Sequence, residues 1–344
     1  MGAPALIILT FGALVISVIL TRRFCDPNSS AYILDHPNER SLHDRPVPRG
    51  GGMAILIAIG TSGSILTALN VNQDLAGIGM SILLVAGVSF IDDRYSISPI
   101  FRLVVHVAAA AVVLYSGFIL TTVEFPGFAW NWPIVAGAVI LVLFVTWMIN
   151  LYNFMDGMDG LAGGMSVVGF GFFAIMGWMT GHEIFLSVSL ITAAASAGFL
   201  AYNFPPARIF MGDVGSSTLG LLAATLLLWG SRDGVFPFWI GILVFSPFIM
   251  DATVTLSRRL LRNEKVWQAH KTHFYQLLVR SGWGHRRTLL LEYAIMIGCG
   301  LSALWGRYAA AEVQVSILTG WILFYLAFFH WVSGRATSDE KAGI

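Results

Sequence analysis

Eleven long apolar stretches, separated by shorter polar segments, constrain the fold of this chain most strongly. Each is close to the ~20 residues that a helix needs to cross the hydrocarbon core of a bilayer. Hydrophobic residues make up 56% of the chain and charged residues 11%, against roughly 25% charged residues in soluble domains. Because lipid offers no hydrogen bonds to exposed backbone, these stretches should be helices. We therefore predict an all-α, polytopic integral membrane protein with spans near 2–21, 51–69, 75–91, 103–120, 132–149, 161–181, 184–202, 214–230, 235–256, 288–306 and 313–332.

The basic residues predict the orientation of these spans. If the chain begins outside the cell, 18 of its 20 Lys and Arg face the cytoplasm, and only Arg232 and Arg307 face outward. This asymmetry follows the positive-inside rule and predicts an outside N-terminus and a cytoplasmic C-terminus. The first span has no basic segment before it, so we interpret it as an uncleaved anchor. The basic inward segments are 22–50, 91–102, 203–213, 257–287 and the tail from 333.

Polar residues at every third position mark the inward loop after the fifth span. Asn150, Asn153, Asp156 and Asp159 stand at the boundary of two very apolar segments. Charged side chains are costly in a membrane, so the run indicates a site at the lipid–water interface for a cation and phosphates. A turn with a helix N-cap would explain the Asp and Gly residues, but not the two asparagines.

Two further inward segments carry carboxylates. Asp92 and Asp93 are adjacent, and their mutual repulsion favours a nearby cation; the alternative is an acidic pair that caps the next helix. Asp213 lies between Gly212 and Gly215 immediately before an apolar helix. A helix N-terminus favours anions, and a carboxylate there can hold Mg²⁺ together with substrate phosphates. A plain N-cap remains the alternative for Asp213.

Histidine and arginine are concentrated in two other inward loops. His270 and His273 have a spacing compatible with a metal pair, but no third zinc ligand accompanies them, so we interpret them as phosphate-binding groups. The first loop contains His36, Arg40, His43, Arg45 and Arg49 before three glycines. It is either a basic lid over an anion or a stretch that contacts anionic lipids. Three polar residues within or near apolar spans, His106, Glu292 and His330, are expected to form interhelical hydrogen bonds.

Five segments, taken in order, resemble the polyprenyl-phosphate N-acetylhexosamine-1-phosphate transferase family. The resemblance covers nearly the whole chain. It implies a single transmembrane transferase domain, 1–344, with about eleven helices and an active site made by cytoplasmic loops. The loops are 22–50, 91–102, 150–160, 203–216 and 257–287, and the segments are D-H-P-N-E-R-S-L-H (35–43), I-D-D-R (91–94), N-L-Y-N-F-M-D-G-M-D-G (150–160), F-M-G-D-V-G-S (210–216) and A-H-K-T-H-F-Y-Q (269–276).

The resemblance implies transfer of a sugar 1-phosphate from a UDP-N-acetylhexosamine to undecaprenyl phosphate, with release of UMP. Mg²⁺, or Mn²⁺ in its place, is the implied cofactor. Asp213 and Asn153 resemble the metal-site positions, and Asp92 resembles the proposed base with Asp93 as its partner. The remaining implied site residues are the carboxylates Asp156 and Asp159 and the substrate-binding residues Asn203, Phe210, His270, His273, Arg45 and Arg49.

Two departures from the family pattern bear on the pathway. The Lys that often follows the acidic pair is missing, and the nearest cation is Arg102. The muramoyl-pentapeptide branch has three consecutive histidines, whereas Lys271 and Thr272 separate His270 from His273 here. This favours the aminosugar branch that initiates O-antigen, a lipopolysaccharide component, over the phospho-MurNAc-pentapeptide transferases.

The resemblance further implies a bacterial inner membrane location, contacts with membrane lipids, a homodimer and no nucleic-acid partner. Two other classes of protein stay open on the residues alone. An ion-coupled transporter would hold its carboxylates near the midplane, and a lipid-binding scaffold would need only the basic loops.

Overall fold

The computed structural model describes residues 2–29, 32–35, 37, 42, 45–69, 73–95, 97–265 and 270–342. His36, Arg40 and His43 of the first inward loop lie outside this set. The helices are α1 (Ala3–Phe24), α2 (Gly51–Leu69), α3 (Gln73–Tyr95), α4 (Pro99–Tyr115), α5 (Ile134–Phe154), α6 (Leu161–Met179), α7 (Glu183–Asn203), α8 (Asp213–Arg232), α9 (Phe238–Leu261), α10 (Phe274–Leu278), α11 (Gly284–Gly306) and α12 (Ala311–Ala342).

The prediction of an all-α, polytopic membrane fold is confirmed. Within the described residues, ten helical segments are long and apolar enough to cross a membrane. The stretch predicted at 103–120 forms the shorter α4, with 17 residues, which would extend about 26 Å at 1.5 Å per residue. A π-helical turn, η1 (Val279–Trp283), joins α10 to α11, and these three elements count together as one of the ten.

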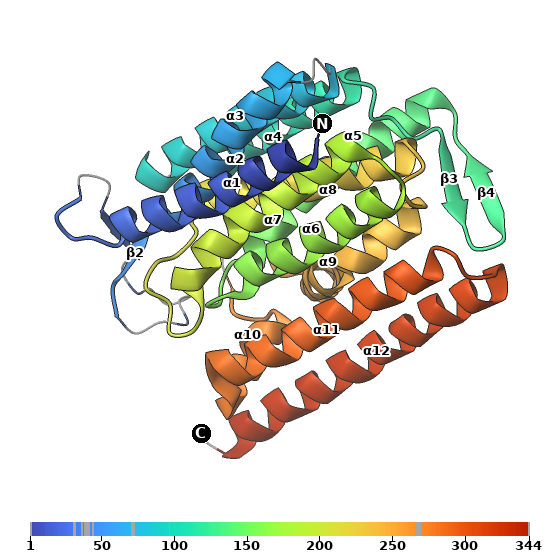
Figure 1. The fold of residues 1–344 in the computed structure, drawn as a ribbon. Coiled ribbons are helices and arrows are strands. Elements are labelled where there is room, and N and C mark those ends of the chain that lie inside the picture. Colours follow the sequence, from blue (N-terminus) through green and yellow to red (C-terminus); the bar gives the residue numbers. More distant parts are fainter. Residues whose placement is uncertain are drawn as a thin grey trace.

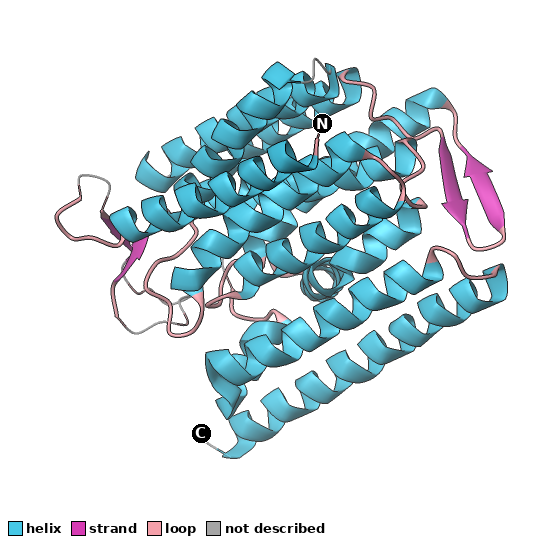
Figure 2. Ribbon diagram, in the orientation of Figure 1, coloured by secondary structure: helices cyan, strands magenta, loops and turns pink. Residues whose placement is uncertain are grey.

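Two short antiparallel hairpins were not predicted. Strands β1 (Ile33–Asp35) and β2 (Val47–Arg49) pair in the first inward loop, with Leu34 opposite Pro48. Strands β3 (Thr122–Phe125) and β4 (Phe128–Asn131) pair between α4 and α5. The two hairpins lie at opposite ends of the helical bundle, and the C-terminus lies toward the end that carries β1 and β2 (Figures 1 and 2).

Helix α8 lies at the centre of the bundle. Its residues from Val214 to Gly230 are all buried, and it packs against α2, α3, α5 and α9. Near its start the backbone crosses α2 so closely that a Cβ atom on Gly52 would lie 2.3 Å from the Gly215 nitrogen. The glycines therefore allow α8 to begin directly beside α2. Asp213, the first residue of α8, then lies at one end of the buried core.

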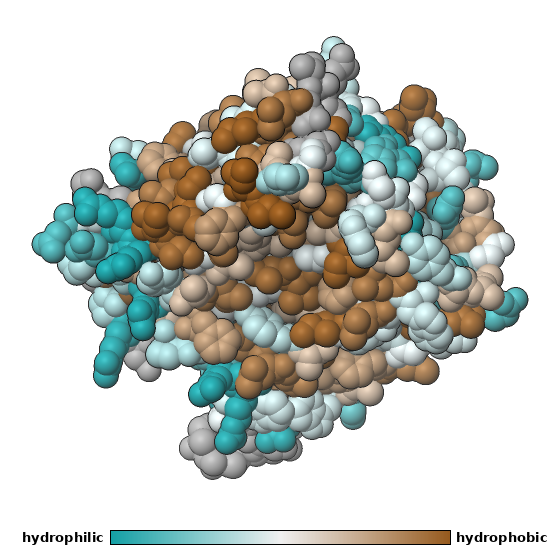
Figure 3. Space-filling view, viewed as in Figure 1, coloured by the Kyte–Doolittle hydropathy of each residue, from teal (hydrophilic) through white to brown (hydrophobic). Residues whose placement is uncertain are grey.

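The outer sides of the helices are apolar. Large hydrophobic side chains such as Ile7, Ile8 and Phe11 of α1 are exposed, as expected for a surface in contact with lipid tails. Figure 3 shows hydrophobic residues over the sides of the bundle and hydrophilic residues gathered toward its ends, most clearly near β1 and β2.

Candidate active site

Two helix ends bring together carboxylates that are far apart in the sequence. Asp92 and Asp93 lie in the last turn of α3, and Asp213 is the first residue of α8. Gly212 precedes α8 with φ of 78°, a conformation that favours glycine. Asp213 therefore does not occupy the N-cap position, and no side-chain cap is present there. Instead, the Val214 N–H donates to the Asp93 carboxylate at 3.5 Å, so a neighbouring helix supplies the negative charge that the start of α8 favours.

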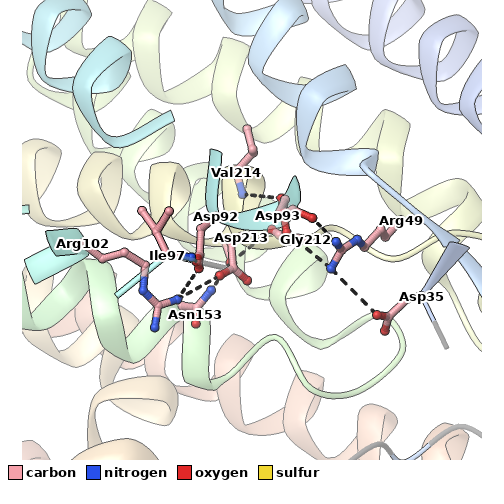
Figure 4. Close-up of polar contacts among 11 residues, drawn as sticks. Asp35, Arg49, Asp92, Asp93, Ile97, Arg102, Asn153, Gly212, Asp213 and Val214 are labelled. Atoms are coloured by element: carbon pink, nitrogen blue, oxygen red, sulfur yellow. Dashed lines mark hydrogen bonds and ion pairs between the residues drawn. The ribbon is translucent and has the colours of Figure 1, made fainter. Parts of the chain in front are cut away.

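Arg102 of α4 lies between two of these carboxylates. Its Nη1 is 2.5 Å from Asp92 Oδ2 and 3.3 Å from Asp213 Oδ2 (Figure 4). The other Asp92 oxygen accepts a hydrogen bond from the Ile97 N–H at 2.8 Å. Asp92 is only 10% exposed, and this largely covered carboxylate is paired and hydrogen-bonded as a charge withdrawn from water requires. The alternative role of the acidic pair, capping the helix that follows it, is not what Asp92 does here.

The first inward loop docks onto this cluster through Arg49. Arg49 Nη1 lies 3.7 Å from Asp93 Oδ1 and 3.9 Å from Asp35 Oδ1, and Nη2 donates to the Asp93 carbonyl (Figure 4). Backbone contacts hold the same strand against the segment before Asp213: the Phe210 N–H donates to Pro48 at 2.8 Å, and the Gly51 N–H donates to Phe210 at 3.0 Å. Arg49 therefore belongs to the site, whereas Arg45 is exposed and makes no hydrogen bond or ion pair with other described residues.

Asn153, at the end of α5, lies beside Asp213 (Figure 4). Its Nδ2 donates to Ser216 Oγ at 3.0 Å, and its amide oxygen accepts no hydrogen bond from the described residues. Asn150, one turn earlier, instead contacts His106 Nδ1 across α4 and α5 at 3.4 Å. This confirms His106 as an interhelical hydrogen-bonding group. Of the two asparagines, Asn150 contacts a neighbouring helix, whereas Asn153 lies at the acidic cluster.

Asp156 adds a further carboxyl group next to the cluster. Burial raises the pKa of this carboxyl group well above its usual 3.8, and the Asp213 and Asp93 carboxylates raise it further. Four carboxylates, Asp92, Asp93, Asp156 and Asp213, thus stand against the two guanidinium groups of Arg49 and Arg102. Such an excess of negative charge favours a bound cation. Among the described residues no three His, Cys, Asp or Glu side chains form a metal cluster, and Mg²⁺ usually takes only one or two protein carboxylates.

Asp159 and Asn203 join two inward loops to each other. Asp159 accepts a hydrogen bond from the Ala207 N–H at 3.0 Å and lies 3.3 Å from His285 Nδ1. Asn203 accepts from the Gly160 N–H at 2.9 Å and donates to the Ile209 carbonyl at 2.8 Å. These contacts assign both side chains a structural task. Their predicted roles toward substrate, like that of Phe210, whose backbone contacts the first loop, remain predictions.

A buried carboxylate of α9 holds His273, the second histidine of the loop between α9 and α10. Asp251 Oδ1 lies 2.9 Å from His273 Nδ1, and the Asp251 carboxylate accepts from the N–H groups of Phe274 and Tyr275, each at 3.1 Å. His270 stacks on His273 with ring centroids 4.8 Å apart. Burial, followed by the charges of His273 and Arg259, lowers the pKa of His270 to about 4, so it is neutral at pH 7.

Two of these residues were not selected from the sequence. The sequence marks Arg102 only as the nearest cation to the acidic pair, and Asp251 stands inside the apolar stretch 235–256. The signal for Asp251 was present, because a carboxylate within a membrane span is costly and usually has a partner. The signal for Arg102 was weak, because ten residues separate it from Asp92 and their proximity depends on how α3 and α4 pack.

The fold is that of a multi-pass membrane protein, and similarity to known proteins assigns it to the transferases. The sequence model of glycosyl transferase family 4 matches residues 75–231, a range that includes Asp92, Asp93, Asn153 and Asp213. A probable undecaprenyl-phosphate N-acetylglucosaminyl 1-phosphate transferase of Bacillus subtilis is 30% identical over 90% of this chain and 86% of its own length. The chain therefore belongs to glycosyl transferase family 4, which confirms the family resemblance drawn from the five motifs.

Two further relatives are more distant. The decaprenyl-phosphate N-acetylglucosaminephosphotransferase of Mycobacterium tuberculosis H37Rv is 29% identical over 75% of this chain and 72% of its own length. The undecaprenyl-phosphate alpha-N-acetylglucosaminyl 1-phosphate transferase of Escherichia coli K12 is 25% identical over 86% of this chain and 82% of its own length. These similarities extend along most of each protein rather than over the central segment alone.

Proposed function

We propose that this protein transfers an N-acetylhexosamine 1-phosphate from a UDP-sugar to undecaprenyl phosphate. The observation that carries the proposal is the cluster of Asp92, Arg102 and Asp213, which lies at helix ends on one end of an apolar bundle. A reaction between a lipid phosphate and a soluble nucleotide sugar needs its site at such a boundary. The names of the relatives support a polyprenyl phosphate as acceptor and N-acetylglucosamine as the sugar.

The reaction breaks one phosphoanhydride bond and forms another. An oxygen of the lipid phosphate attacks the phosphorus atom that carries the sugar, and UMP leaves with the electrons of the broken bond. Phosphoryl transfer asks a protein mainly to position anions and to offset developing charge. In this proposal Asp92 keeps the lipid phosphate deprotonated or in position, and the Arg102 and Arg49 guanidinium groups supply positive charge beside two anionic substrates.

The donor atoms at the site fit Mg²⁺. Asp213 provides a carboxylate, and Asn153 provides an amide oxygen that no described residue engages; both are hard oxygen donors of the type Mg²⁺ prefers. Asp156 stands close enough to feel the charges of the cluster and would orient the nucleotide and metal. When bound, the metal would offset the charge of the diphosphate and of the departing UMP. Mn²⁺ has the same preference for oxygen and should substitute for it.

Charge distribution supports a site that faces the cytoplasm of a bacterial inner membrane. The end of the bundle with the acidic cluster also carries the predicted inward loops and 18 of the 20 basic residues by sequence. UDP-sugars are made in the cytoplasm, which agrees with this orientation. The product, a lipid-linked sugar diphosphate, would start an envelope glycan such as O-antigen. The separated histidines His270 and His273 favour this route over peptidoglycan synthesis.

A UDP-sugar panel with purified protein, polyprenyl phosphate and Mg²⁺ tests the proposal. We expect release of UMP with UDP-N-acetylglucosamine, and only when the lipid phosphate is present. Release of UDP would indicate ordinary glycosyl transfer and would overturn the proposal. Turnover of UDP-MurNAc-pentapeptide alone would assign the peptidoglycan branch. Absence of UMP with all donors, together with ion-driven uptake into proteoliposomes, would identify a transporter instead.

A further inference from the structure

Arg102 contacts the two carboxylates unequally. The pair with Asp92 is short, at 2.5 Å, and its carboxylate is 10% exposed. The pair with Asp213 is longer, at 3.3 Å, and its carboxylate is 33% exposed. Because water screens exposed charges, the contact with Asp213 is the weaker of the two. A change that breaks only one of these two ion pairs should therefore break the pair with Asp213 and leave the pair with Asp92 intact.

The contact with Asp213 engages one of the two carboxylate oxygens that could bind a metal. Arg102 Nη1 hydrogen-bonds Asp213 Oδ2, and the Asn153 amide lies at the same carboxylate (Figure 4). A divalent cation held by Asp213 would also repel the guanidinium that contacts the same carboxylate, because like charges repel. The guanidinium and a metal would therefore compete for Asp213.

We propose that Arg102 is a positioning residue that competes with a bound metal for Asp213 and is displaced from this carboxylate when the metal binds. This inference rests on the proposed metal role of Asp213. Before the metal arrives, the guanidinium holds Asp213 in place and offsets the repulsion among the four carboxylates. Once the metal has bound, the Arg102 guanidinium stays paired with Asp92. The N–H group that no longer contacts Asp213 then becomes available to the substrates.

The proposal predicts that Arg102 weakens metal binding. Replacing it with Gln removes the competing charge and should tighten Mn²⁺ binding about tenfold, given the attraction of unit charges at this distance and its reduction by solvent. Arg102→Lys keeps a charge and should bind Mn²⁺ close to wild type. Arg49→Gln is the matched control, because it removes the same charge from the same cluster but from a residue that pairs with Asp93. It should change the affinity less than about threefold.

Mn²⁺ binding to the full-length protein in nanodiscs, without nucleotide or lipid substrate, provides the test, with the free ion followed by electron paramagnetic resonance. Thermal unfolding of each variant establishes that it is folded. Equal or weaker Mn²⁺ binding by Arg102→Gln, while Asp213→Asn abolishes binding, would overturn the displacement by Arg102 but keep the metal site. Equal tightening in Arg49→Gln would also overturn it, since the effect would then reflect net charge. Wild-type binding by Asp213→Asn would instead remove the metal site of the proposed function, and this inference with it.

Discussion

The Tyr275 hydroxyl at the start of α10 donates a hydrogen bond to the main-chain carbonyl of Phe154 at 3.2 Å. Phe154 is the last residue of α5 and directly follows Asn153. The contact therefore joins the histidine loop to the segment that carries the proposed metal-site amide and Asp156. The Tyr275 ring is fully buried. Packing around the ring and the hydrogen bond to Phe154 therefore both fix the position of the hydroxyl.

Tyr275→Phe should weaken this connection without removing the ring. The loss of one hydrogen bond costs about 0.5–1.5 kcal/mol, so we expect a small fall in the unfolding temperature. UMP release should fall severalfold, because the end of α5 gains freedom. The measurement is thermal unfolding in parallel with UMP release. Tyr308→Phe, at an exposed tyrosine after α11, is the control, and an equal effect in both variants would contradict the coupling.

Asp251 of α9 should matter more for stability than any single side chain of the histidine loop that it contacts. Asp251→Ala leaves two buried N–H groups and His273 without their acceptor, and each unsatisfied group costs about 1–3 kcal/mol. Asp251→Asn retains one carbonyl acceptor and should be intermediate. Thermal unfolding ranks the three proteins. An alanine variant as stable as wild type would show that α10 does not depend on this anchor.

Asp213→Asn should abolish turnover while the protein stays folded. The substitution keeps the shape of the side chain but removes the charge, and loss of a catalytic metal costs orders of magnitude in rate. Because Gly212 rather than Asp213 occupies the N-cap, little stability should be lost. UMP release against Mg²⁺ concentration provides the measurement, with Asp26→Asn in the exposed first loop as a control. A folded variant with more than about a tenth of wild-type activity and an unchanged Mg²⁺ midpoint would exclude the metal role.

Asp156 should make the metal-free protein less stable as the pH rises. Its pKa in the folded protein is well above the usual 3.8, so the folded state holds a proton that the unfolded state releases. Stability from this group is complete below pH 3.8 and is lost as the pH rises through the raised pKa. Asp156→Asn should therefore flatten the fall in unfolding temperature as the pH rises above 3.8 in the absence of metal. Parallel curves for the two proteins would contradict the raised pKa.

Membrane topology is testable with single cysteines in a protein without Cys25 and Cys299. Asn263 follows α9 in the predicted cytoplasmic loop, and Glu124 lies on the exposed hairpin at the opposite end. A membrane-impermeant thiol reagent applied to intact cells should label Glu124→Cys and leave Asn263→Cys unlabelled until the cells are opened. The reverse pattern would invert the orientation inferred from the basic residues.

Local patterns in the sequence determined the fold class, the number of long apolar segments and the family. Each depends on residues close together in the chain: a run of about 20 apolar residues must form a helix in lipid, and motifs such as 210–216 keep their order. The sequence also singled out Asp92, Asp93, Asn153 and Asp213 as candidates, because charged and polar side chains at a membrane boundary are costly without a partner.

Only the tertiary structure decided which of these residues meet. Arg102 reaches Asp213 across 111 positions in the sequence, and Asp159 turns to Ala207 and His285 although it belongs to the same run as Asn153. The direction of a side chain at a helix end depends on how the helices cross, and the crossing of α8 over α2 depends on the absence of side chains at Gly52 and Gly215. Packing between distant segments therefore determines which of the candidate residues lie together at the site. No local sequence pattern encodes that packing.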